Sequence, residues 1–260
     1  MKRLLIASAV AAALIVGLWL IAIPETLLLE KIKDTFRGEK LSVTIDGFSK
    51  GFFYHCTARK VTLVSSGTAL LSIDNLNAGV NPLALIIMRL PLYFDGGIAG
   101  GMMNGDFDLL SGGDRMTAGV FNANIQGIDF FSVLGLSGQG LLTGNFAYLK
   151  GKGHANFFIR DMRLDNKPFL GISLPLDAFG IMRGAIEVNA GGVDITSLSL
   201  EGKSIFARVK GRVGGGMVDL AMEIMPDPAF NDKDNLLMLL ASYRKSPGYY
   251  IVPIKGPLSF

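Results

Sequence analysis

The chain has 260 residues, of which half are hydrophobic, a formal net charge of +3 and a mean hydropathy of +0.41. Its basic residues are scattered rather than clustered, so no nucleic-acid partner is expected. The single cysteine, Cys56, excludes an intrachain disulfide and a thiolate metal cluster. The length allows one large domain or two small ones.

The N-terminus carries an uncharged apolar run from Leu4 to Ile23, preceded by Lys2 and Arg3. About 20 apolar residues at ~1.5 Å each are long enough to cross the hydrocarbon core of a bilayer. A cleaved signal peptide is the alternative, but its apolar core is usually only ~7–15 residues long and ends in a small-x-small site. Leu20-Ile21-Ala22 fits such a site poorly, so the sequence predicts a transmembrane anchor over residues 1–23.

The orientation of this anchor rests on its short N-terminal flank. Lys2 and Arg3 favour a cytoplasmic N-terminus, whereas the basic residues between positions 31 and 40 favour the opposite. Because long domains are translocated largely regardless of charge, we give the short flank more weight. The expected location is the bacterial inner membrane, in a single pass, with the C-terminal domain in the periplasm.

An amphipathic helix is expected to follow the anchor over residues 24–38. Leu28, Ile32 and Phe36 recur at every fourth position, and Gly38 ends the pattern. Beyond it, apolar residues alternate with polar ones, which is typical of strands. The first such strand begins at Leu41, and two more are expected on either side of a turn at Ser66-Gly67.

The stretch "GRVGGGMVDLAMEIM", residues 211–225, gives the clearest hairpin signal. Apolar residues alternate on both sides of Gly214, Gly215 and Gly216, and glycine accepts the positive φ angles of a tight turn. Strands with very short turns recur along most of the chain, which favours an up-and-down antiparallel sheet. Connections this short exclude repeated βαβ units, since each crossover needs a dozen or more residues.

A few short helices interrupt the expected strands. Asn81-Pro82 resembles a helix start, and Asp129 is suited to cap a second short helix. A third is expected to carry Leu236, Leu239 and Leu240, after Pro226 and Pro228 end a strand. In the closing strand Pro253 indicates a sheet edge, because proline cannot donate to a ladder.

These elements predict a mainly β protein, built on one large, strongly curved antiparallel meander sheet that forms a half-open groove. Residues 39–260 are expected to form one periplasmic β-domain. The apolar face of this sheet forms either an ordinary packed core or a groove that is accessible to lipid, and the residues alone do not decide between the two. The candidate groove residues are Phe121, Phe146, Tyr148, Phe157, Ile159, Ile186, Val188, Ile205, Val209, Leu220 and Met222.

Motifs for catalysis are not evident in the sequence. His55 and His154 are isolated, and "GLSGQG" at 135–140 has Gln139 where a nucleophile elbow requires glycine. We therefore expect no catalytic, metal-binding or cofactor-binding residues, no cofactor and no enzymatic activity.

The chain resembles the type II secretion system protein N family, GspN, which is itself similar to the AsmA/TamB-like proteins. The resemblance is carried by the single span, by "LSVTIDGFSKGFFYHCTARKVTLVSSGTALLSIDNLNAGVNPLALIIMRLPLYFDGGIAGG", by "VKGRVGGG" and by the closing "GYYIVPIKGPLSF". Gly256-Pro257 departs from the Gly-Thr expected there. The resemblance implies an inner-membrane anchor, a periplasmic β-domain and an accessory role in exporting folded proteins. Similarity to AsmA-like proteins instead implies a curved sheet that handles lipid.

Two functions are therefore expected. The first is a membrane-anchored accessory component of type II protein secretion, which acts by binding other secretion-system proteins. The alternative is an AsmA-like protein that binds or transfers phospholipid or another lipid in an apolar β-groove, at roughly 0.8 kcal/mol for each buried CH₂ group.

Overall fold

The structure is a computed structural model that describes most of the chain. The described residues are 24–35, 41–52, 54–81, 84, 89, 91–108, 115–133, 136–165, 168–169, 172–173, 176–230 and 236–257. The expected membrane anchor over residues 1–23 lies outside them, as does most of the helix expected after Asn81. Among the described helices, none is long and apolar enough to span a bilayer.

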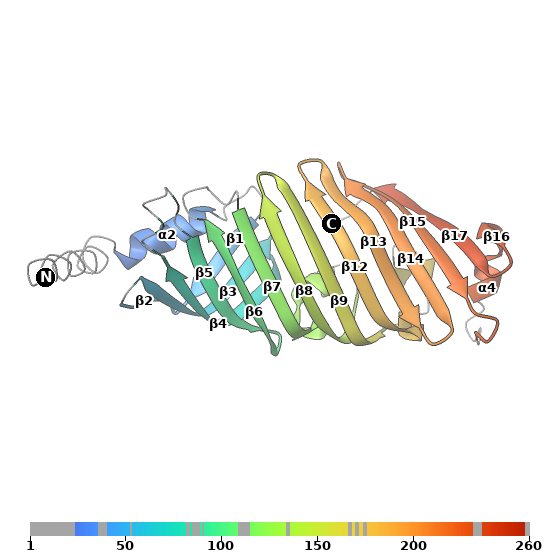
Figure 1. Ribbon diagram of the computed structural model, residues 1–260, viewed down its shortest axis with the longest axis horizontal. Coiled ribbons are helices and arrows are strands. Elements are labelled where there is room, and N and C mark those ends of the chain that lie inside the picture. The colour runs from blue at the N-terminus through green and yellow to red at the C-terminus, as the bar shows by residue number, and fades with distance from the viewer. Residues whose placement is uncertain are drawn as a thin grey trace, which may run out of the picture. The chain divides into compact units, whose positions relative to one another are not determined.

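The protein is mainly β, with one large antiparallel sheet that does not close on itself (Figure 1). Its strand order is β1-β3-β4-β5-β6-β7-β8-β9-β12-β13-β14-β15-β17-β16, with the short β2 paired to β3. The strands are β1 (Leu41–Asp46), β2 (Ser49–Lys50), β3 (His55–Ser65), β4 (Thr68–Val80), β5 (Pro91–Ile98), β6 (Gly101–Asp108), β7 (Arg115–Asn124), β8 (Gly138–Leu149), β9 (Lys152–Leu164), β12 (Phe179–Asn189), β13 (Gly192–Gly202), β14 (Ile205–Gly214), β15 (Met217–Pro226), β16 (Arg244–Ser246) and β17 (Tyr249–Pro257). A separate two-stranded ribbon joins β10 (Pro168–Phe169) to β11 (Ile172–Ser173).

The predicted meander is confirmed, because strands that follow one another in the chain nearly always pair with one another. The glycine hairpin joins β14 to β15, with Gly214 opposite Met217. Gly215 and Gly216 form its two-residue turn at φ +58° and +73°, a pair of angles that suits glycine. The predicted Ser66-Gly67 turn likewise joins β3 to β4.

The helices are few and short, as expected. They are α2 (Glu25–Thr35), η3 (Ile125–Gly127), α3 (Asp129–Val133), η4 (Leu176–Ala178), α4 (Leu236–Leu239) and η5 (Ala241–Tyr243). The helix expected around Leu236, Leu239 and Leu240 corresponds to α4. Leu236 and the following Leu240 are buried one turn apart, whereas Leu239 is 55% exposed.

By its internal contacts the chain divides into two compact units. The first unit comprises Met1–Ile98 and Met103–Gly113, and the second comprises Ala99–Met102 and Asp114–Phe260. In the first unit the buried side chains include Cys56, Ala58 and Ala78, of which Cys56 and Ala78 face each other in the β3–β4 register. Burial raises the pKa of the Cys56 thiol from about 9 to about 11, with a smaller opposing contribution from the charge of Lys50.

A charged pair also lies in the first unit. Asp108, at the end of β6, is 5% exposed, and its Oδ2 accepts a hydrogen bond of 3.0 Å from Nε of Arg89. A buried carboxylate is costly unless it is paired, so the contact with Arg89 stabilises the charge of Asp108 at the end of β6.

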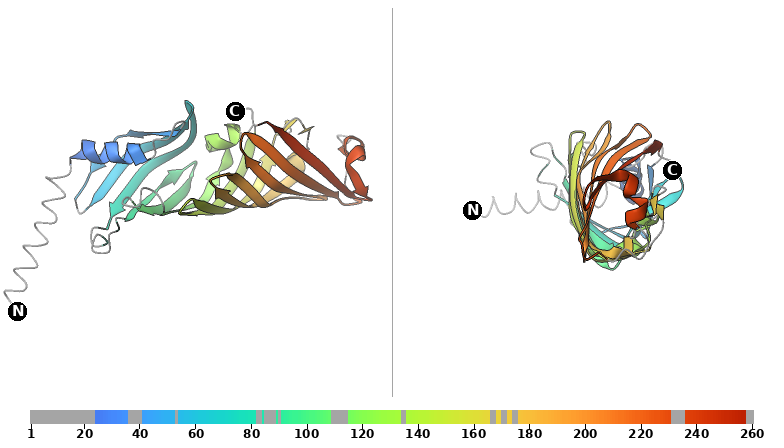
Figure 2. Two further views of the ribbon diagram at one scale, coloured as in Figure 1. Left: turned by 90° about the horizontal axis from the view of Figure 1, so that it is seen from above. Right: turned by 90° about the vertical axis from the view of Figure 1, so that its right-hand side faces the viewer.

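The second unit has the larger core. Its sheet bends around α4, which lies on the inner side of the curve (Figure 2). One cluster of buried side chains comes from β9, β12, β13, β14, β15 and β17, and it is covered by Leu176 of η4 and by Leu236 and Leu240. Burying a large aliphatic side chain contributes roughly 1.5–3 kcal/mol, so these short helical segments are held in place mainly by their leucines.

Candidate functional site

The candidate site is the face of the second unit's sheet that carries the core, here called the inner face. Residues directly opposite each other in an antiparallel pair point to the same side, so the register defines this face. It carries no charged residue on the six strands from β8 to β15. Its members there include Leu142, Gly144, Phe146, Tyr148, Gly153, Ala155, Phe157, Ile159, Met182, Gly184, Ile186, Val188, Val193, Ile195, Leu198, Leu200, Ile205, Ala207, Val209, Gly211, Val213, Val218, Leu220, Met222 and Ile224.

One part of the inner face is packed core. Five of the predicted groove residues lie there, each at most 6% exposed: Ile159, Ile205, Val209, Leu220 and Met222. The void beside Ile205 and Met222 has a volume of only about 10 Å³, which is at most room for one water molecule. An acyl chain has no space here, so these five residues stabilise the fold.

The other part is less covered and contains five further predicted residues, here called the apolar floor: Phe146, Tyr148, Phe157, Ile186 and Val188. All five are half-buried. The register places them on three neighbouring strands, with Phe146 and Ile186 both opposite Ala155, and Tyr148 and Val188 both opposite Gly153. The rings of Phe146 and Tyr148 stack, with centroids 6.5 Å apart and planes inclined by 19°. The floor is therefore a continuous apolar surface with partial access to solvent.

Glycines on the inner face make room for the aromatic rings of the floor. A Cβ atom added at Gly184 would lie 2.1 Å from Cζ of Phe157, and one added at Gly153 would lie 3.1 Å from the ring of Phe146. Because neither glycine has a side chain, an aromatic ring from the neighbouring strand can lie directly over its backbone. The sequence showed these glycines and aromatics as alternating residues, but only the register shows that each ring lies over a glycine on the next strand.

Phe121 does not lie with the other predicted groove residues. It is 49% exposed and belongs to a bulge of β7, where the register with β8 shifts between Val120 and Ala123. The extra residue, Asn122, has φ +53° and its N–H is bonded to Oγ1 of Thr143. A bulge inserts one residue and so turns the neighbouring side chain to the opposite face, which simple alternation does not anticipate.

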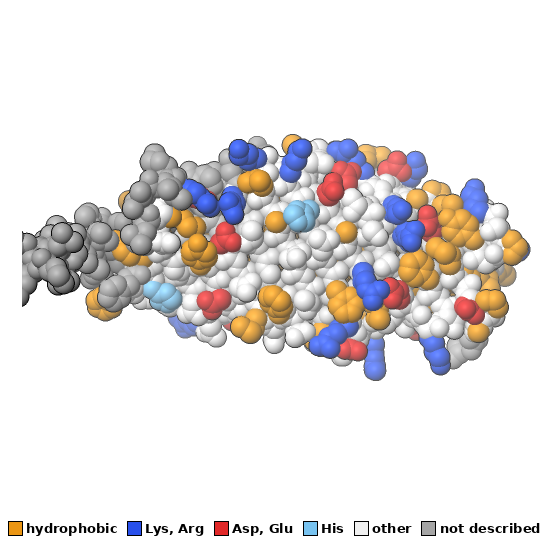
Figure 3. All heavy atoms as spheres, viewed as in Figure 1, with side chains coloured by type: hydrophobic (Ala, Val, Ile, Leu, Met, Phe, Trp, Pro, Cys, Tyr) orange, Lys and Arg blue, Asp and Glu red, His pale blue; other side chains and the backbone are white. Residues whose placement is uncertain are grey.

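The outer face of the same sheet carries charged side chains as well as apolar ones, with Arg183 lying over the ring of Phe158 and Arg208 over the ring of Phe206. Acidic and basic side chains lie near one another over β12–β17 (Figure 3). The cross-strand ion pairs are Arg183–Glu201, Arg208–Glu223 at 3.9 Å, Arg212–Asp194 at 3.7 Å and Lys255–Asp219 at 3.0 Å. Exposed pairs of this kind contribute little to stability, roughly 0–1 kcal/mol each, so their main effect is to keep this face in water.

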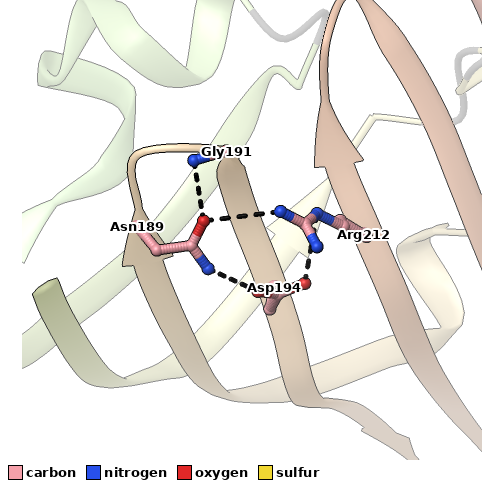
Figure 4. A network of polar contacts seen from close by, with 4 residues as sticks. All are labelled: Asn189, Gly191, Asp194 and Arg212. Carbon is pink, nitrogen blue, oxygen red and sulfur yellow. Dashed lines mark hydrogen bonds and ion pairs between the residues drawn. The ribbon is translucent and has the colours of Figure 1, made fainter.

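One polar network fixes the hairpin between β12 and β13 (Figure 4). Oδ1 of Asn189 accepts from the N–H of Gly191 at 2.9 Å and from Nη2 of Arg212 at 3.4 Å. Nδ2 of Asn189 donates to Oδ2 of Asp194 at 2.8 Å. The network ties three strands together at one end of the apolar floor, where Val188 is the last floor residue.

A separate polar hollow of about 340 Å³ lies beside η3 and α3. It is lined by Ile125, Gln126, Phe131, Ser132, Leu136, Ser137, Gly138, Gln139, Arg163 and Asp165. Ser137, in the "GLSGQG" stretch, has a buried hydroxyl without a hydrogen-bond partner among the described residues. No histidine lines the hollow, and His55 and His154 are both exposed elsewhere. In the described part of the chain, no group of three or more His, Cys, Asp or Glu side chains is placed to hold a metal ion.

Comparison with known proteins identifies no relative: no family model, no curated protein and no solved structure matches this chain.

Proposed function

We propose that the second unit binds an apolar chain, such as the acyl chain of a phospholipid or another lipid, in a half-open groove whose base is the apolar floor. The observation that carries this proposal is the inner face itself, which is uncharged across six strands and only half-buried at the floor. A soluble β protein normally covers such a surface fully, and an apolar patch left accessible is a typical binding surface.

The energetics favour a long aliphatic ligand. Each CH₂ group transferred from water onto the floor contributes roughly 0.8 kcal/mol, so ten such groups would contribute about 8 kcal/mol before the entropic cost of binding. The absence of charge on the inner face from β8 to β15 means that a charged headgroup has no partner there. The headgroup would therefore remain outside the groove, at its rim or in water.

An inner-membrane anchor over residues 1–23 completes this proposal. It would hold the domain beside the bilayer, on the periplasmic side, where lipid is the nearest apolar ligand. The apolar run from Leu4 to Ile23 supports the anchor, because its length matches the thickness of the hydrocarbon core. No catalytic step is part of the proposal.

Photo-crosslinking of the full chain in bacterial cells tests lipid binding. p-Benzoylphenylalanine is placed at Val188, on the floor, or at Glu187, the next residue of β12, which is exposed on the outer face. After irradiation of cells labelled with radioactive phosphate or acetate, a lipid adduct is expected at position 188 and not at 187. Equal labelling at both positions, or none at either, would reject the groove.

A charged substitution provides the second arm of this experiment. Ile186→Glu places a carboxylate on the floor, where lipid adducts at position 188 are expected to fall strongly. Ala185→Glu places the same charge on the outer face of the same strand and should leave them unchanged. If both substitutions reduce the adduct equally, the adduct reflects general proximity to the membrane and not occupation of the floor.

An accessory role in type II protein secretion is the second candidate, and the resemblance to the GspN family supports it. The outer face, with its cross-strand ion pairs and the rings of Phe158 and Phe206, is a surface suited to protein contacts. Cross-linking in intact cells followed by mass spectrometry of the purified complex is the test. Recovery of secretion-system components supports this role, and their consistent absence counts against it.

A further inference from the structure

The polar hollow beside η3 and α3 is not used by the proposed lipid groove. Its volume of about 340 Å³ is within the usual range for small-molecule sites, about 300–1,000 Å³. It lies where β8 begins and β9 ends, at the pair Gly138 and Leu164, whereas the apolar floor extends to the other end of these strands, at Tyr148 and Gly153. Fully buried Ile159 lies on β9 between the two. The hollow is therefore a separate site, and a test of one does not decide the other.

Backbone contacts hold the lining of the hollow together. The N–H of Leu136 donates to the carbonyl oxygen of Phe131 at 2.9 Å, which holds Leu136 beside α3. The N–H of Asp165 donates to the carbonyl oxygen of Ser137 at 2.8 Å, which holds the end of β9 beside the start of β8. A Cβ atom at Gly138 would lie 2.2 Å from the carbonyl oxygen of the opposite strand, so this close approach requires glycine.

Ser137 contributes a buried hydroxyl that the protein itself does not satisfy. Its carbonyl oxygen accepts the hydrogen bond from Asp165, but its Oγ has no hydrogen-bond partner. Among the residues that the structure describes, this is the only buried side-chain nitrogen or oxygen atom without one. Leaving a buried hydroxyl unpaired destabilises a fold, and such a group calls for an explanation. A polar group of a ligand in the hollow would supply the missing partner.

Two charged residues, Arg163 and Asp165, also line the hollow. Both are exposed, and within the described part of the chain neither forms an ion pair with the other or with a further side chain. One guanidinium and one carboxylate thus remain available, and the formal charge of the lining is zero. A ligand that satisfies both groups carries one anionic group and one cationic group.

The deeper part of the lining is apolar. Ile125 is buried, and Phe131 and Leu136 are half-buried. The polar residues Gln126 and Gln139 are exposed, so they lie toward the solvent side of the hollow. An aliphatic or aromatic group of the ligand gains free energy by leaving water for the three apolar side chains.

We propose that this hollow binds a free amino acid with an apolar side chain. Arg163 binds the carboxylate of the ligand, Asp165 binds its ammonium group, and the hydroxyl of Ser137 donates to the carboxylate. The apolar side chain of the ligand contacts Phe131 and its apolar neighbours. Because exposed ion pairs are weak, the expected dissociation constant is on the order of 0.1–1 mM.

Equilibrium dialysis of radiolabelled L-leucine against the detergent-solubilised full chain, with empty micelles as the blank, tests the site. Saturable binding is expected. N-acetyl-L-leucine lacks the ammonium group and L-leucinamide lacks the carboxylate, so each should compete at least about tenfold less well than L-leucine. Absence of saturable binding up to about 10 mM L-leucine, or equal competition by all three compounds, would overturn the proposal.

Two variants assign the two charges. In Asp165→Asn, leucine binding should weaken about tenfold, and the preference over N-acetyl-leucine should disappear while the preference over leucinamide remains. Arg163→Gln should give the opposite pattern. Arg160→Gln and Asp161→Asn change exposed residues of β9 that do not line the hollow, so as matched controls they should leave binding unchanged. Equal losses in the controls, or losses without a changed preference among the analogues, would refute the assigned contacts.

Ser137→Ala separates ligand binding from a role in the fold. Leucine binding should fall about fivefold to tenfold, because the ligand loses a hydrogen bond. Alanine also removes an unsatisfied buried hydroxyl, so the midpoint of thermal unfolding without leucine should stay the same or rise. Ser197→Ala, at an exposed position of β13, should change neither quantity. A lower unfolding midpoint for Ser137→Ala together with unchanged leucine binding would show that the hydroxyl serves the fold alone, and would overturn the proposal.

Discussion

Gly184 and Phe157 offer the sharpest test of how the apolar floor is built. Substitution Gly184→Ala adds a Cβ atom 2.1 Å from the Phe157 ring, whereas ordinary contact begins at 3.4 Å, so the ring must move by the difference of about 1.3 Å. Overpacking of this kind typically costs 1–3 kcal/mol. Because Phe157 is half-buried and can yield toward the open side, we expect about 1 kcal/mol of destabilisation.

The same substitution should change sign when the ring is removed. Gly184 lies within β12 and has no positive φ angle, so alanine fits its backbone. Without the ring, Gly→Ala is expected to stabilise the protein by about 0.5–1 kcal/mol, since it lowers the entropy of the unfolded chain. Urea unfolding, followed by far-UV circular dichroism, is measured for wild type, Gly184→Ala, Phe157→Ala and the double variant.

The expected coupling between the two positions is about 1.5–2 kcal/mol, the difference between the two effects of alanine. Lipid adducts at position 188 should also change in Gly184→Ala, because the displaced ring occupies part of the groove. If Gly184→Ala has the same effect on unfolding with and without Phe157, the ring does not rest on this glycine. The described geometry of the floor would then be wrong.

Three further predictions concern the two cores. Ile159→Ala should lower the free energy of unfolding by about 2–5 kcal/mol, because the side chain is 0% exposed. Val188→Ala on the half-buried floor should lower it by under about 1 kcal/mol. Similar losses for the two variants in urea unfolding would contradict the division into core and floor. Arg89→Met leaves the buried carboxylate of Asp108 without this partner and should cost about 1–3 kcal/mol, and Asp108→Asn in the same background should recover part of it. The Cys56 thiol, with its pKa raised to about 11, should react with a thiol reagent at pH 8 at least about 100-fold more slowly than in the urea-unfolded chain. Because the raised pKa favours the protonated folded form, the free energy of unfolding should fall as the pH rises from 9 to 11. Fast labelling of the folded protein would show that the thiol is not buried.

The sequence predicted the sheet and its order well because the contacts that define a meander are local. Each hairpin is specified by its own turn, as with Gly215 and Gly216, and by alternation on either side. The same local reasoning failed at Phe121, because a bulge changes the face of a side chain without a strong signature in the composition.

The candidate site was foreseen as a set of residues but not as an arrangement. Alternation correctly assigned Phe146 and Ile186 to the same face as Ile159. It gave no reason, however, to place Ile159 in the packed core and the other two on the half-buried floor. The separation depends on what covers each part of the face. Leucines from η4 and α4, far along the chain, bury one part and leave the other half-buried.

The sequence by itself determined the class of the fold, the direction of the chain through the sheet and the apolar character of one face. These follow from a two-residue period and from turn glycines, which act over a few residues. Only the tertiary structure decided which apolar residues are core and which form the floor. Such properties depend on segments brought together from distant positions, and no local pattern records which surface another segment will cover.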